Sequence, residues 1–173
     1  MPNKKTLANF TSLKQATDMS CWACTSRMIV NYYEDSEQYS SDQKIADAYA
    51  TLTNNVNDKD LSKSKSASDV LTLLGYKNEM DDHHFPTYNE IKATIDADTP
   101  LLSLVATQSP TGLDAQHESN HWVVIVGYDN GQIVVADPYQ NNLITIAYDK
   151  DKYVYSGYAD TYYWVNTSYV DKK

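Results

Sequence analysis

The sequence predicts an α+β fold, with helices first and an antiparallel sheet after them. Through the first half of the chain, apolar residues recur at spacings of three and four, the period of helices that bury one face. In the second half, two apolar runs at 121–128 and 132–137 flank Asp129-Asn130-Gly131, a sequence typical of a hairpin turn. We therefore expect one domain, with a helical lobe over about residues 1–97 and a sheet lobe over about 98–173.

The first predicted helix follows a cap at Asp18 or Ser20, so that Cys21 falls in its first turn. There the free N–H groups and the helix dipole favour a negative charge, which suits a thiolate. The apolar face of this helix is expected to comprise Trp22, Thr25, Met28, Ile29 and Tyr32, and its polar face Arg27, Asn31 and Glu34.

Three more helices are expected before the sheet. The second covers about 43–53, where apolar residues recur at helical spacing. The third covers about 69–74, with Ser68 as its N-cap and Gly75 in the C′ position just past its end. The fourth covers about 87–97 and opens on a Thr-x-x-Glu capping box.

The remaining segments are predicted to be strands and polar loops. The hairpin arms are apolar nearly throughout, so we expect the hairpin to be central and covered on both faces. Further strands are expected at 76–80, 101–106, 142–147 and 161–165, with polar loops at 54–66, 81–86 and 108–120 and an extended polar start at 1–14. We find no internal repeat.

Charge and composition narrow the classes of function. The net charge of −9 argues against nucleic acid or an anionic membrane surface as the main partner. No apolar run is long enough to cross a bilayer, and the first residues lack the apolar core of a signal peptide, so neither membrane insertion nor a signal peptide is expected. The two cysteines are too few for a disulfide framework.

Four residues together predict thiol chemistry. A cysteine nucleophile needs a base to take its proton, a group that orients the base, and donors for the oxyanion. His121 opens a buried strand and is the natural base, and Asp137 ends the partner strand and is the natural orienter. Gln15 lies six residues before Cys21, where its side-chain amide and the Cys21 backbone N–H could form a two-donor oxyanion site.

The register of the hairpin decides whether Asp137 can reach His121. A plain two-residue turn would place Asp137 opposite Val124, and its side chain would then point to the face opposite His121. A three-residue loop places Asp137 opposite Val123, on the face of His121 and within side-chain reach. We therefore predict Gly131 in a left-handed conformation within a bulged turn, or else a bulge further along the hairpin.

This constellation resembles the papain-like cysteine peptidases. The matching pieces are Gln15, the helix start SCWAC around Cys21, the strand HWVVIVGYD that begins at His121, and ADPY, whose Asp137 follows the histidine by 16 residues. The pattern looks most like the compact bacterial branches, which include the bacteriocin-processing double-glycine peptidases and papain-like effectors of plant pathogens. Papain itself has Asn where this chain has Asp137.

The resemblance implies a papain-like fold with its active site between a helical lobe and a sheet lobe. It also implies the roles of nucleophile for Cys21, base for His121, orienter for Asp137 and oxyanion donor for Gln15. The expected activity is peptide-bond hydrolysis through a thioester, on a polypeptide substrate, by a monomer without cofactor or metal. By family analogy we expect a protein secreted by, or delivered from, a bacterium.

Other interpretations of the same residues stay open. Cys21 and Cys24 spell C-x-x-C, which could be a thiol-disulfide oxidoreductase pair, but the βαβ context of that motif is missing. A zinc site would need His83 and His84, and the spacing typical of such sites is absent. A deamidase or acyltransferase could use the same triad, and a binding module could have kept the fold. We expect Cys24 to be packing, His83, His84 and His117 to be surface loop residues, and the tyrosine-rich tail at 153–169 to be sheet edge and packing.

Overall fold

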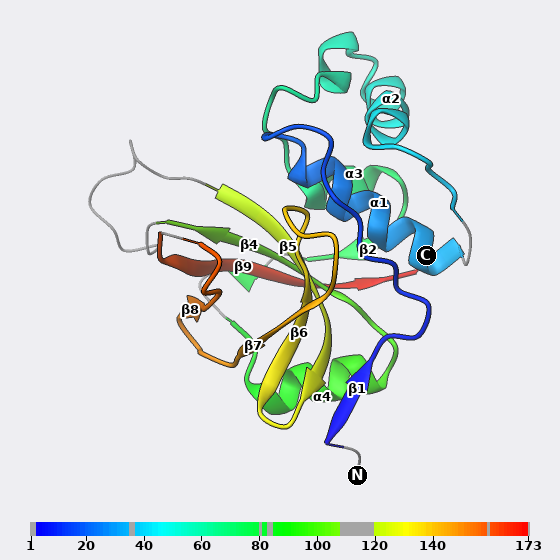
Figure 1. The fold of residues 1–173 in the computed structure, drawn as a ribbon. Coiled ribbons are helices and arrows are strands. Elements are labelled where there is room, and N and C mark those ends of the chain that lie inside the picture. Colours follow the sequence, from blue (N-terminus) through cyan, green and yellow to red (C-terminus); the bar gives the residue numbers. More distant parts are fainter. Residues whose placement is uncertain are drawn as a thin grey trace.

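The structure is a computed structural model, and it describes residues 3–34, 37–79, 81–82, 85–107, 120–158 and 160–172 (Figure 1). The fold is α+β, as the sequence predicted. Its helices are α1 (Cys21–Glu34), α2 (Asp42–Thr53), the 3-10 turn η1 (Val56–Lys59), α3 (Ala67–Leu73) and α4 (Tyr88–Asp96). Among the helices in the described residues, none combines the length and apolarity needed to cross a membrane.

The strands form a curled sheet in which every described pair is antiparallel. Its main path runs β2-β9-β4-β5-β6-β7, with β1 added to β5 and both β3 and β8 added to β9. The hairpin β5–β6 is buried along most of its length, as expected from its apolar arms. The strands are β1 (Lys4–Thr6), β2 (Lys77–Asn78), β3 (Asp81–Asp82), β4 (Leu101–Ala106), β5 (Asn120–Asp129), β6 (Gln132–Ala136), β7 (Ile144–Ala147), β8 (Lys152–Tyr153) and β9 (Tyr162–Asp171).

The two layers do not divide at residue 97. Figure 1 shows α1, α2 and α3 together beyond one end of β5 and β6, whereas α4 and β1 lie at the other end. β1 pairs with β5, and α4 packs against the same strand. The segments β1 and α4 therefore accompany the sheet, although the sequence assigned residues 1–97 to the helical lobe. Short-range periodicity identifies a helix but does not say which layer covers its apolar face.

Most predicted helix ends are confirmed. The capping box forms, since Thr87 and Glu90 exchange side-chain to backbone hydrogen bonds at the start of α4. Gly75, which follows the C-cap residue Leu74 of α3, has φ of 93°, as expected for a C′ glycine. The cap of α3 is Ser66, not Ser68, because the Ser66 hydroxyl accepts from the Asp69 N–H and the helix begins two residues earlier than predicted.

Helix α1 is buried on nearly all sides. Every residue from Cys21 to Val30 is buried, because α2, α3 and β5 all pack against the helix. The predicted polar face is therefore wrong for Arg27, which is only 9% exposed. Its charge is balanced within the fold: the guanidinium lies 3.4 Å from Asp42 and donates to the carbonyls of Tyr39 and Ser40.

The hairpin turn contains two residues. Asn130 and Gly131 both have positive φ, 49° and 88°, and Asp129 pairs directly with Gln132. Positive φ at both central residues is the pattern of a type I′ turn, which matches the twist of the strands it joins. The left-handed Gly131 is confirmed, and the three-residue loop is wrong.

A bulge further along the hairpin then supplies the required register. The pairing shifts by one residue at Val126, so that beyond it Val124 lies opposite Ala136. Asp137, the next residue after Ala136, therefore comes to the face of the sheet that carries His121. This is the second of the two arrangements predicted from the sequence, and it is confirmed.

Strand β1 pairs antiparallel with β5 and ends next to the same bulge. The N–H of Leu7, the residue directly after β1, donates to the carbonyl of the bulged residue Val126 at 2.8 Å. The neighbouring Gly127 is required by the close approach of β1, because a Cβ atom there would lie 2.6 Å from the carbonyl oxygen of Lys5. Residues 4–7 thus lie beside the bulge that aligns the candidate site.

Candidate active site

His121 and Asp137 meet in the interior of the protein. Nε2 of His121 lies 2.7 Å from Oδ1 of Asp137, and both side chains are at most 1% exposed. His121 is the second residue of β5, and Asp137 directly follows β6. The hydrogen bond assigns Nε2 to the acid, so the other ring nitrogen, Nδ1, is the one available for further chemistry.

The carboxylate of Asp137 accepts four hydrogen bonds. Oδ1 accepts from His121 and from the backbone N–H of Tyr139 at 2.9 Å, whereas Oδ2 accepts from the hydroxyls of Tyr153 at 2.7 Å and Tyr158 at 2.6 Å. Burial alone would raise the pKa of Asp137, but the hydrogen bond and charge of His121 and the two tyrosine hydroxyls hold that pKa below its usual value. The acid is thus fixed as an anion.

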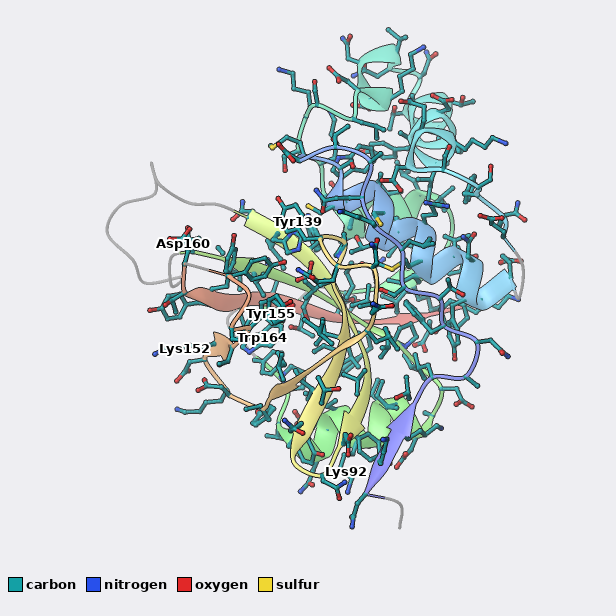
Figure 2. The ribbon with its side chains drawn as sticks, in the orientation of Figure 1. Lys92, Tyr139, Lys152, Tyr155, Asp160 and Trp164 are labelled. Atoms are coloured by element: carbon teal, nitrogen blue, oxygen red, sulfur yellow. The ribbon has the colours of Figure 1, made fainter. Side chains whose placement is uncertain are left out.

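The ring of His121 is enclosed by two tyrosines. Tyr139 stacks on it with ring centroids 4.3 Å apart and planes 9° from parallel, and Tyr158 meets it edge-on at 6.2 Å. Tyr139 also reaches across to the helical side, where its hydroxyl donates to the Asp18 carbonyl at 3.1 Å. Figure 2 shows Tyr139 at the end of the sheet that faces α1, with Tyr155 and Trp164 deeper along the sheet.

Cys21 lies beside His121 across the junction of the two layers. Burial lowers the pKa of His121, but hydrogen bonds and charges from Asp137 and from Cys21 outweigh burial and raise the pKa to about 9. Nδ1 is buried and has no conventional hydrogen-bond partner among the described residues. Because Asp137 occupies Nε2, Nδ1 is the ring atom left to face the thiol. The arrangement favours a protonated imidazole next to the sulfur of Cys21.

The start of α1 leaves backbone donors free at Cys21. Ser20 is the N-cap by position, since its carbonyl accepts from the N–H groups of Ala23 and Cys24. Its hydroxyl does not cap the helix: it accepts from the Thr17 N–H at 2.9 Å and lies 3.2 Å from Asp42 Oδ2. In the described part of the chain, the Cys21 N–H has no partner, so it is available to an oxyanion.

Gln15 is held next to this helix start from both layers. Its backbone N–H donates to the carbonyl of Pro138 at 2.8 Å, one residue after Asp137. Its side-chain Nε2 donates one hydrogen to the Thr17 carbonyl at 2.6 Å, and the second hydrogen of the amide stays available. The side chain is buried, with 8% of the residue exposed, so its amide is fixed in place rather than free in solvent.

Two tryptophans, Trp22 directly after Cys21 and Trp122 directly after His121, hold a third segment next to the site by hydrogen bonds. Trp22 donates from Nε1 to the carbonyl of Lys63 at 2.9 Å, and Trp122 donates to the carbonyl of Lys65 at 3.2 Å. The segment 63–65, part of the predicted loop 54–66, is therefore anchored beside both Cys21 and His121.

Comparison with known proteins decides the family. The model of the Peptidase_C39-like family matches residues 7–171, nearly the whole chain. The chain belongs to the C39-like peptidase family. No curated protein matches the sequence.

Two crystal structures share the fold of this C39-like chain. One is described as a C39-like peptidase from Bacillus anthracis, with 17% identity and a TM-score of 0.56 over 99% of this chain and 100% of that one. The other is the peptidase domain of Streptococcus ComA, a bifunctional ABC transporter involved in quorum sensing, with 12% identity and a TM-score of 0.57 over 95% of this chain and 100% of that domain. The resemblance to papain-like bacterial peptidases predicted from the sequence is thereby confirmed.

The C39-like site brings together all four residues selected from the sequence, Gln15, Cys21, His121 and Asp137. Cys24 is fully buried one turn along α1, where its Sγ lies 3.4 Å from the Leu13 carbonyl, and burial followed by the charge of Asp42 raises the pKa of its thiol. His83, His84 and His117 lie outside the described residues. Within the described ranges, no group of three His, Cys, Asp or Glu side chains is arranged to hold a metal ion.

Sequence reasoning missed the tyrosine hydroxyls that donate to Asp137. The tyrosine-rich tail was expected to serve as sheet edge and packing, yet Tyr153 and Tyr158 donate directly to Asp137. Tyr139 was also missed as the residue that stacks on His121. Its position two residues after Asp137 was a usable signal, because a residue so close to the acid must lie near the imidazole.

Proposed function

We propose that this chain is a papain-like cysteine peptidase that hydrolyses peptide bonds with Cys21, His121, Asp137 and Gln15. The observation that carries the proposal is the buried His121, whose Nε2 is bound to an ionised Asp137 while Nδ1 is left for the thiol at the start of α1. An acyl acceptor at a helix N-terminus, next to an imidazolium, is the arrangement that thiol acyl transfer requires.

The proposed acylation step begins from the thiolate–imidazolium pair. Sγ of Cys21 attacks the carbonyl carbon of the scissile peptide bond, and the negative charge moves to the carbonyl oxygen. In this proposal the Cys21 N–H and the second hydrogen of Gln15 Nε2 donate to that oxygen, the first hydrogen being bound to the Thr17 carbonyl. As the C–N bond breaks, His121 gives its Nδ1 proton to the leaving nitrogen, and a thioester remains on Cys21.

Deacylation returns the enzyme to its starting state. Neutral His121 takes a proton from a water molecule, whose oxygen attacks the thioester carbon through a second oxyanion. The C–S bond breaks, the carboxylic acid product leaves, and the proton held by His121 restores the ion pair. Asp137 stays ionised throughout and keeps the imidazole in the orientation that presents Nδ1 to sulfur.

The burial of Cys24 argues against the redox alternative. A C-x-x-C oxidoreductase needs a second thiol that can attack a mixed disulfide on the first. Cys24 is 0% exposed, and its burial raises the pKa of the thiol, so a resolving thiolate is strongly disfavoured at that position. The buried imidazole and carboxylate would also have no role in a dithiol cycle.

The test is cleavage of a proteome-derived peptide library, with products identified by mass spectrometry. Wild type should create new amino and carboxyl termini, Cys21→Ala should create none, and the matched Cys24→Ala variant should keep the wild-type pattern. Conversion of glutamine to glutamate without chain cleavage would overturn peptidase activity in favour of deamidation. Transfer of an acyl group to an added amine, without hydrolysis, would do the same in favour of an acyltransferase.

A further inference from the structure

A buried carboxylate that takes no part in the proposed reaction, that of Asp42, contacts the segment just before α1. Asp42 is the first residue of α2 and only 2% exposed. Its Oδ2 accepts from the Ala16 N–H at 2.8 Å and lies 3.2 Å from the Ser20 hydroxyl, while Oδ1 lies 3.4 Å from Arg27 Nη1. Asp42 is not the cap of α2, because Ser41 fills that position.

The two groups bound by Oδ2 flank the candidate oxyanion donors. Ala16 directly follows Gln15, and Ser20 directly precedes Cys21. A single oxygen atom therefore links both ends of the segment that carries the Gln15 amide and the free Cys21 N–H. The Ser20 hydroxyl, which also lies 3.2 Å from the Thr17 carbonyl, accepts from the Thr17 N–H inside the same loop.

The single arginine of the sequence, Arg27, pairs with this buried carboxylate and, at 3.5 Å, with the exposed Glu37. Arg27 lies one and a half turns along α1 from Cys21, and its guanidinium also donates to the carbonyls of Tyr39 and Ser40, just before α2. Burying an ion pair costs desolvation energy that a pair of apolar residues would avoid. A contribution to stability is therefore a poor explanation of the Arg27–Asp42 pair. The other oxygen of Asp42 contacts Ala16 and Ser20, in the loop before Cys21.

We propose that Asp42 is a positioning residue for the oxyanion site, acting through the 15–20 segment. It fixes the Gln15 amide relative to the Cys21 N–H, so that both donors point at one oxygen atom. A donor that is out of place by a fraction of an ångström loses much of its effect on the transition state. The inference rests on the proposed acyl-transfer function and adds a residue that does not touch substrate.

Two reactions of Cys21 separate positioning from general stability. Acylation by p-nitrophenyl acetate passes through an oxyanion, whereas alkylation by iodoacetamide needs the thiolate but forms no oxyanion. For Asp42→Asn we expect acylation to slow by about tenfold or more, less than the roughly 100-fold loss typical of deleting a donor outright. Alkylation should stay within about twofold of wild type, since Asp137 and His121 are untouched. Asp47→Asn, at an exposed position on the same helix, is the matched control and should change neither rate.

Ser20→Ala provides a milder variant should Asp42→Asn fail to fold, because it removes only one of the links to Oδ2. It should shift the ratio of acylation to alkylation in the same direction. Equal losses in both reactions, or no loss in either, would overturn the role of Asp42. If wild type itself forms no acyl-enzyme while Cys21 alkylates normally, the proposed function falls, and this inference falls with it.

Discussion

Removing the Tyr153 hydroxyl should weaken the fold and narrow the pH range in which Asp137 is ionised. Tyr153 is 2% exposed and donates to Oδ2 of Asp137 at 2.7 Å, and Tyr158 is the other donor to that oxygen. A hydrogen bond to a charged group contributes about 1.5–3 kcal/mol, and because Oδ2 keeps one donor we expect Tyr153→Phe to cost the lower part of this range, about 1.5–2 kcal/mol. Tyr158→Phe should lower stability more in the Tyr153→Phe protein than in wild type, since the double variant leaves Oδ2 of Asp137 without a donor.

The pH dependence of this effect has a definite sign. The pKa of Asp137 in the folded protein lies below its usual value, so the stability it contributes is present at neutral pH and is lost as the pH falls through the folded pKa. With one donor gone, that pKa rises, and the loss begins at a higher pH. The acid limb of the activity profile should shift to higher pH in the same variant.

Urea unfolding at several pH values, together with pH–rate profiles, measures both effects. Tyr155→Phe is the matched control, since among the described residues its hydroxyl has no hydrogen-bond partner and its ring packs against Tyr158. A Tyr153→Phe protein as stable as this control, with an unshifted acid limb, would refute the view that the tyrosine tail holds the acid.

Three further predictions concern the reacting groups. Gln15→Ala should lose about 2–4 kcal/mol of transition-state stabilisation, which steady-state kinetics would record as a lower turnover with little change in KM. An unchanged turnover would remove Gln15 from the site. Cys24→Ser should keep most activity with a modest drop in Tm, because its side chain is buried at the Leu13 carbonyl; loss of activity in a folded variant would contradict its assignment as packing. Activity should fall as the pH rises through about 9, where His121 loses the proton that the leaving group needs, and a profile flat to pH 10.5 would be inconsistent with a protonated His121.

The fold class could be predicted because its signals are local in the sequence, and the bonded pair His121 and Asp137 could be selected because both residues belong to one hairpin. The capping box at Thr87, the glycine after α3 and the apolar hairpin arms depend on neighbours in the chain, and they appear in the structure as expected. The sequence could predict that the hairpin needs a bulge, because without one a two-residue turn would put Asp137 and His121 on opposite faces of the sheet. It could not predict that the bulge lies at Val126. The bulged residue contacts Leu7, which is far away in the sequence, so its place could not be read from the residues around it.

What the sequence could not supply are contacts between distant segments. Arg27 looked like a surface residue because its partners, the Asp42 carboxylate and the Tyr39 and Ser40 carbonyls, come from the next segment of chain. The tyrosines of the tail looked like packing because nothing near them in the sequence needs a donor. A hydroxyl reveals its role only when the fold brings it to a buried charge, as Tyr153 and Tyr158 are brought to Asp137.

The most direct test of the account is alkylation of Cys21 by iodoacetamide near neutral pH, followed by peptide mapping, in wild type, His121→Ala and Cys24→Ser. We predict rapid labelling of Cys21 alone, much slower labelling in His121→Ala because the thiolate loses its counter-ion, and unchanged labelling in Cys24→Ser. A Cys21–Cys24 disulfide that forms readily and cycles with glutathione, without dependence on His121, would contradict the central claim.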